Sequence, residues 1–157
     1  MKSPAERNSL IVGIDPGKSG GIAVVSESTI KASKTPLDTI QMSMLVKSAI
    51  NSAHIENQKL TVYIENVHAF PTDGRSSAFK FGMNYGMWLG ILASNNLTPI
   101  KVSPFKWMQE FAPLPKQKKE RKRMLKQIAQ EMFPSIKVTL NTADAILIAV
   151  YGVNNEQ

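Results

Sequence analysis

The sequence contains no cysteine and only two histidines among its 157 residues. Without cysteine the chain can form no disulfide, no zinc–thiolate site and no thiol nucleophile. His54 and His68 are too few for most metal sites that are built from histidine. Any metal chemistry must therefore depend on carboxylates, and carboxylate oxygens favour magnesium or manganese.

Long apolar runs are also missing. The N-terminal segment MKSPAERNSL has no apolar signal core, and no later run has the length that crosses a membrane. We expect a cytoplasmic protein without membrane contact. The length predicts one domain over residues 1–157, with residues 1–8 as a flexible tail.

Negative charge is scarce relative to positive charge. Nineteen Lys and Arg residues face twelve Asp and Glu residues, which gives a formal net charge of +7. Such an excess favours a polyanionic partner such as nucleic acid, although many basic proteins bind none. Charge alone therefore leaves the partner open.

Apolar periodicity predicts an α/β domain with a mixed sheet. Residues 10–14 and 22–25 are separated by a glycine-rich turn, so we expect them to form an antiparallel hairpin. A helix capped by Asp38 and a strand that ends near Glu65 follow. The expected strands are 10–14, 22–25, 29–33, 60–64 and 99–102, and the expected helices are 38–53, 76–94, 103–111, 117–133 and one that starts near Asn141.

Three carboxylates lie at the ends of apolar segments. Asp15 ends the first strand, Glu65 ends the fourth, and Asp144 lies in the first turn of the last helix. If the two strands are neighbours, Asp15 and Glu65 emerge at the same edge of the sheet. A divalent cation would relieve the repulsion between acids held so close together. Local explanations stay open, because Asp15 suits a turn and Asn141 with Asp144 suits a helix cap.

These motifs resemble the RuvC family of Holliday junction resolvases. The segments Ile11–Gly17, Tyr63–Val67 and Ala143–Ala149 carry the resemblance, which extends from Ile11 to about Gly152. It implies an RNase H-like fold with a mixed five-stranded sheet, and a homodimer that cuts four-way DNA junctions. It also implies a magnesium cofactor, for which manganese can substitute, with Asp15, Glu65 and Asp144 as metal ligands.

One position departs from the family pattern. The family has a further acid, or sometimes a histidine, one helical turn before the last aspartate, and this chain has Asn141 there. On a helix, Asn141 and Asp144 would share a face and point to the same site. We therefore count Asn141 among the catalytic and metal-binding candidates, with weaker cleavage than an Asn141→Asp variant. An Asp→Asn substitution that retains binding and a natural site of three acids both stay open.

The resemblance implies phosphodiester hydrolysis with two metal ions about 4 Å apart. Asp15 would bridge the ions, Glu65 would bind one of them and Asp144 the other. Products would carry 5′-phosphate and 3′-hydroxyl ends.

A basic helix is the main candidate for DNA contact. Lys119, Arg123 and Lys126 fall on one helical face, while Leu125 and Ile128 can face the core together with Met132. A solvated helix face would explain the same charges. The candidates for backbone contact on this helix are Lys118, Lys119, Lys122, Arg123 and Lys126.

Aromatic and basic residues also begin the preceding long helix. Arg75 and Lys80 are candidates for phosphate contact, and Lys18 in the glycine-rich turn is another. Phe79 or Phe81 would stack on an unpaired base, unless both are core residues. Gly82, Gly86 and Gly90 lie four residues apart and predict close approach by another element. With Met83, Met87 and Trp88, they favour either a dimer interface or an intramolecular core.

Four other interpretations compete with a junction resolvase. An actin-like ATPase or sugar kinase opens with a similar hairpin but needs far more chain. The segment Pro16–Ser19 is similar to part of a P-loop but lacks its upstream glycine. A non-catalytic junction-binding protein, and a nuclease for forks, flaps or RNA–DNA hybrids, fit the same residues.

Overall fold

The computed structural model describes residues 8–68 and 70–156, so residues 1–7 of the predicted flexible tail lie outside the described residues. The elements follow the predicted order closely. The strands are β1 (Ser9–Asp15), β2 (Gly21–Val25), β3 (Ile30–Lys34), β4 (Lys59–Glu65) and β5 (Ile100–Val102). The helices are α1 (Thr39–Ile55), α2 (Arg75–Ser94), α3 (Pro104–Met108), α4 (Lys118–Met132) and α5 (Ala143–Asn155), and a 3-10 turn over Gln109–Phe111 follows α3.

The strands form one five-stranded sheet in the order β3-β2-β1-β4-β5. β1 and β2 pair antiparallel, as do β2 and β3, whereas β1 with β4 and β4 with β5 pair parallel. The predicted mixed sheet and the predicted hairpin are therefore confirmed. Because Pro16–Ser19 joins two antiparallel strands and no helix follows, the P-loop interpretation is wrong.

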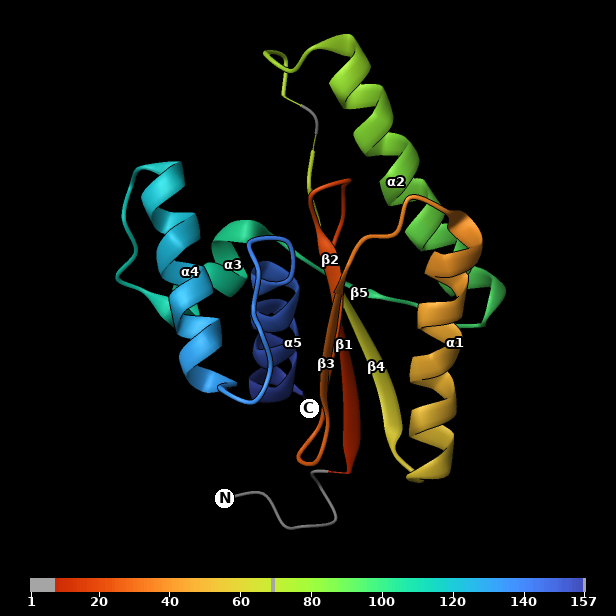
Figure 1. Cartoon of the computed structure of the whole chain (residues 1–157). Helices are drawn as coiled ribbons and strands as arrows, with labels where there is room; N and C mark the ends of the chain where they lie inside the picture. The colour runs from red at the N-terminus through yellow and green to blue at the C-terminus, as the bar shows by residue number, and fades with distance from the viewer. Residues whose placement is uncertain (1–7, 69, 157) are drawn as a thin grey trace.

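Helices cover both faces of the sheet, with α1 and α2 on one side and α3, α4 and α5 on the other (Figure 1). Successive side chains of β1 point to opposite faces of the sheet, so the core is divided between the two helical layers. Ile11 packs in the cluster that includes α5, whereas Val12 and Ile14 pack in the cluster that includes α1 and α2. α2 continues beyond the end of the sheet in Figure 1. No helix within residues 8–68 and 70–156 is long and apolar enough to span a membrane.

Gly13 allows α5 to lie directly on the central strand. A Cβ atom at Gly13 would stand 2.2 Å from the carbonyl oxygen of Ala145 and 2.5 Å from the amide nitrogen of Ala149. Only glycine permits such a close approach of two backbones. This contact brings the first turn of α5 beside the end of β1.

The N-termini of two helices differ in how well the sequence predicted them. Asp38 caps α1 as expected, because its Oδ1 accepts a hydrogen bond from the amide of Ile40 at 2.6 Å. α5, in contrast, begins at Ala143 with Thr142 as its N-cap residue. The cap predicted at Asn141 is therefore wrong. A turn closed by the side chains of Thr139 and Thr142 precedes the helix instead.

Candidate active site

Asp15 and Glu65 end two neighbouring parallel strands in matching register. Gly13 pairs with Tyr63 and Ile14 with Ile64, so the next residues, Asp15 and Glu65, lie side by side at the carboxyl edge of the sheet. Side chains alternate along a strand, and Tyr63 packs in the cluster that includes α5. Both carboxylates therefore point toward the face that α5 covers.

Asp144 completes the group from the first turn of α5. All three acids line one cleft of about 920 Å³. Asp15 and Asp144 are 8% and 5% exposed, so they lie deep in the cleft. The three acids therefore lie in one cleft, as the sequence predicted.

Burial and mutual repulsion both act on these carboxyl groups. Burial, followed by the charges of Glu65 and Asp144, raises the pKa of Asp15 well above 3.8. Burial also raises the pKa of Glu65, although the hydrogen bond from Trp107 opposes this rise. Raised pKa values on neighbouring carboxyl groups indicate that the site has too little positive charge to balance them when they ionise.

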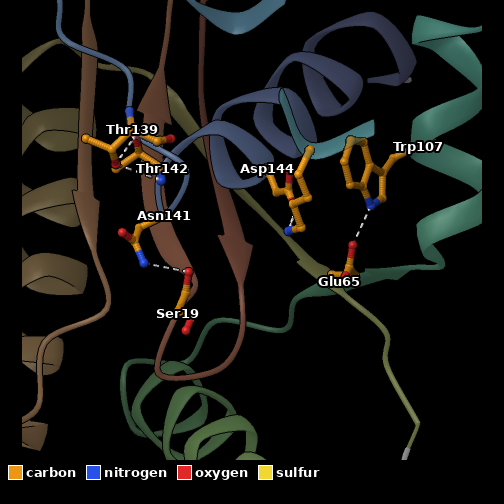
Figure 2. Close-up of polar contacts among 8 residues, drawn as sticks. Ser19, Glu65, Trp107, Thr139, Asn141, Thr142 and Asp144 are labelled. Atoms are coloured by element: carbon orange, nitrogen blue, oxygen red, sulfur yellow. Dashed lines mark hydrogen bonds and ion pairs between the residues drawn. The ribbon is translucent and has the colours of Figure 1, made fainter. Parts of the chain in front are cut away.

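Trp107 holds one oxygen of Glu65. Its indole Nε1 donates a hydrogen bond of 2.7 Å to Glu65 Oε2, as Figure 2 shows. Trp107 is buried and belongs to α3, which begins two residues after β5. Trp107 was not among the site residues predicted from the sequence. The signal was a tryptophan in the short helix after the strand that pairs with β4.

Lys122 enters the acidic group from α4. Its ammonium forms an ion pair with Asp144 Oδ2, and Asp144 Oδ1 is buried without a hydrogen-bond partner. Among the residues that the structure describes, no set of three His, Cys, Asp or Glu side chains is arranged to hold a metal ion. The donors nevertheless fit a divalent ion in kind, because they are carboxylates and one buried oxygen has no partner.

Asn141 is oriented differently from the prediction. It lies two residues before α5 begins, and its Nδ2 donates a hydrogen bond of 2.8 Å to the carbonyl oxygen of Ser19 (Figure 2). It does not line the cleft. The expectation that Asn141 and Asp144 share a helical face is wrong, because Asn141 is not helical.

Two of the five residues predicted on α4 for DNA contact, Lys118 and Lys122, line the cleft. The α4 residues that line the cleft are Lys118, Arg121, Lys122 and Leu125. The predicted face of Lys119, Arg123 and Lys126 lies elsewhere on the helix. Met132, predicted for the core, is 46% exposed, and Ala129 is buried instead. Arg121 was missed; its Nη1 also donates to the carbonyl oxygens of Pro115 and Lys116.

The remaining predicted contact residues divide between the cleft and the outer surface. Lys18 and Lys80 line the cleft, whereas Arg75 and Phe79 are exposed outside it. Phe81 lines the cleft beside Gly17, whose φ of 112° suits glycine. The cleft thus combines buried acids with basic side chains from three parts of the chain.

Gly82, Gly86 and Gly90 form a stripe on α2 that no described residue covers. A Cβ atom at Gly82, Gly86 or Gly90 would meet nothing described within 4 Å. The predicted close approach by another element therefore does not occur within the described residues. Trp88 is completely buried in the core, so it cannot contribute to an interface.

Comparison with known proteins identifies the fold. No protein-family model and no curated protein sequence matches the chain. Two solved structures of RuvC from Thermus thermophilus are similar. One, in complex with a Holliday junction substrate, has a TM-score of 0.58 and 18% identity, and the match covers 94% of this chain and 96% of that one. The other has a TM-score of 0.55 and 18% identity, with 90% and 92% covered. The chain therefore has the RNase H-like fold of RuvC.

Proposed function

We propose that this chain is a divalent-metal-dependent endonuclease that cuts branched DNA, with the four-way Holliday junction as its substrate. One observation carries the proposal. Asp15, Glu65 and Asp144 come from β1, β4 and α5, far apart in sequence, and line a single cleft with basic side chains. The similar RuvC structure in complex with a Holliday junction supports this choice of substrate.

The three carboxylates would hold magnesium or manganese. Ions held there would lower the pKa of a water molecule and offset negative charge on the phosphate. Hydrolysis in which water adds to phosphorus and the 3′ oxygen leaves would give 5′-phosphate and 3′-hydroxyl ends. The chain's own residues set up this chemistry. β1 and β4 fix Asp15 and Glu65 side by side, and Trp107 orients the Glu65 carboxylate.

Basic residues at the cleft would bind the sugar–phosphate backbone. Lys18, Lys80, Lys118 and Arg121 line the cleft that contains the acids. Each phosphate contact contributes about −0.9 to the slope of log affinity against log salt. Neutralising Lys118 and Arg121 together should therefore flatten the slope by about 2.

A matched pair on α4 separates this contact from general charge. Lys119 and Arg123 belong to the same helix but do not line the cleft. Neutralising this pair removes the same charge, and we expect the salt slope to change by less than about 1. If neutralising Lys118 and Arg121 changed the salt slope no more than neutralising Lys119 and Arg123, the cleft would not bind the backbone.

We propose a homodimer formed through α2. Its exposed residues after Lys80 carry no charge, and they include Met83 and the open glycines Gly82, Gly86 and Gly90. An uncharged face with room for close backbone approach fits a second copy of the same helix. Light scattering should give about twice the 17.3 kDa of one chain, and Gly86→Glu should give the monomer.

Junction cleavage tests the function directly. A labelled four-way junction incubated with this chain and magnesium should receive paired nicks in opposed strands, and manganese should support the same reaction. Asp15→Asn should abolish the nicks and leave junction binding intact, because the carboxylate holds the ion and the basic residues hold the DNA. Undiminished nicking by Asp15→Asn would refute the proposed site. Forks and flaps in the same assay define the substrate range.

A junction-binding protein without nuclease activity is the second candidate. Two observations favour it: the Asn141 amide is bound to Ser19, and Lys122 is paired with Asp144. In that case the junction would shift on a gel without nicks in either metal.

A further inference from the structure

Lys122 is the cation of the cleft that contacts the acids directly. The same cleft is also lined by Lys18, Lys80, Lys118 and Arg121. Among these five described cations, only Lys122 forms an ion pair with a carboxylate of the cleft. Its side chain is 40% exposed, whereas that of Asp144 is 7% exposed. The lysine thus extends from the edge of the cleft to a buried carboxylate.

The surrounding charges keep Lys122 protonated. Burial acts to lower its pKa, but attraction to Asp144, and then to Asp15 and Glu65, outweighs burial and raises the pKa. A single ammonium among three carboxylates does not balance their charge. The unpartnered Asp144 Oδ1 lies on the carboxylate that Lys122 contacts, so this acid has capacity for a further cation.

We propose that Lys122 is a tethered counter-ion that competes with the divalent metal for Asp144. The inference rests on the proposed function only in taking Asp144 as a metal ligand. An ammonium and a divalent ion repel each other, so the two cannot share one carboxylate without loss of affinity. Lys122 therefore weakens metal binding while no DNA is present. Once displaced, its flexible side chain is free to pair with a phosphate oxygen in the same cleft, which couples metal binding to DNA binding.

The test measures binding of Mn²⁺ alone to the DNA-free protein by titration calorimetry. Lys122→Gln removes the competitor, and we expect roughly fivefold tighter Mn²⁺ binding, which corresponds to about 1 kcal/mol for a partly exposed pair. Lys122→Arg keeps the charge and should bind Mn²⁺ as weakly as the parent. Lys118→Gln is the matched control, since it removes one charge from the same cleft and helix without breaking an ion pair. We expect its affinity to stay within about twofold of the parent.

A second signal locates the ion. Trp107 donates to Glu65, so its fluorescence should change as Mn²⁺ enters, at a lower concentration in Lys122→Gln than in Lys118→Gln. Circular dichroism verifies that each variant is folded. Equal Mn²⁺ affinities for Lys122→Gln and Lys118→Gln, or no measurable binding by any variant, would overturn the proposal. Junction cleavage by the parent is scored separately, so the nuclease function can fail while the competition stands, and the reverse.

Discussion

Replacing Asp15 with asparagine should stabilise the metal-free protein and abolish the junction cleavage that we propose for it. Asp15 is 8% exposed, and burial together with Glu65 and Asp144 raises its pKa well above 3.8. Ionised Asp15 is thus unfavourable in the folded state. Asparagine has nearly the same shape and no charge, and relief of a buried, poorly compensated polar group is worth about 1–3 kcal/mol. At about 2–4 °C per kcal/mol for a chain of this size, a gain of 2 kcal/mol raises Tm by about 4–8 °C.

The pH dependence follows from the direction of the pKa shift. Between 3.8 and the raised pKa, folded Asp15 holds a proton that the unfolded chain has released. Its destabilising effect is therefore greatest above the raised pKa and fades as the pH falls through that value toward 3.8. Asp15→Asn should melt higher than the parent at about pH 8, and the difference should shrink at about pH 4.5.

The assay is thermal unfolding in the presence of EDTA, monitored by circular dichroism. Asp38→Asn is the matched control, because Asp38 is exposed and caps α1, a role that asparagine fills equally well. We expect no change in Tm for that variant. A Tm of Asp15→Asn at or below the parent at about pH 8 would refute the account of a strained acidic site.

Three further predictions test the surroundings of the site. Gly13→Ala should destabilise the fold by about 3 kcal/mol in urea unfolding, since the new Cβ would collide with the backbone of α5; a loss well under 1 kcal/mol would contradict this packing. Trp107→Phe should shift the acidic limb of the pH–rate profile to higher pH, because the lost hydrogen bond had lowered the pKa of Glu65; an unmoved limb would deny Trp107 that role. Asn141→Asp removes the amide that donates to the Ser19 carbonyl oxygen, so the new carboxylate must move away from that oxygen. We expect this variant to cleave junctions faster than the parent with magnesium, and equal or slower cleavage would exclude a fourth metal ligand at position 141.

The acidic group was predictable from the sequence for a simple physical reason. Two apolar strands that both end in an acid place those acids together if the strands are parallel neighbours, and the register of β1 and β4 fulfils this condition. Asp144 was predictable because it lies in the first turn of a strongly apolar helix that must pack on the sheet. Gly13 is the position of β1 at which α5 comes closest, which agrees with a helix that packs on the sheet.

The side chains that surround the acids were harder to predict, because helical periodicity does not reveal what a helix faces. On α4, Lys122 and Lys118 continue the row of Leu125 and Ala129 toward the N-terminus. Lys118 and Lys122 were predicted to contact DNA, but the sequence did not indicate that Lys122 also forms an ion pair with one of the acids. At this end of the helix the row overhangs the cleft, and a long lysine can bury its stem while its ammonium reaches a carboxylate.

Asn141 illustrates a different limit. The last helix was predicted to start near Asn141, and α5 begins two residues later, at Ala143. At 100° of rotation per residue, a shift of two residues redirects a side chain completely. Hydroxyl contacts between Thr139 and Thr142 stabilise the turn that delays the helix. Such local side-chain bonds compete with helix formation on nearly equal terms, so the sequence pattern does not decide between them.

The positions of the acids and their neutralisation therefore depend on different parts of the chain. β1, β4 and α5 fix the three carboxylates through backbone pairing and through the contact at Gly13, and these constraints hold whatever cation is present. Their compensating charge comes from Lys122, a partly exposed side chain on a separate helix that can move without disturbing the sheet. If the three acids bind metal as we propose, a rigid set of ligands with a movable counter-ion would exchange one cation for another at little conformational expense. Such an exchange would let the site assemble only when metal and DNA are both present.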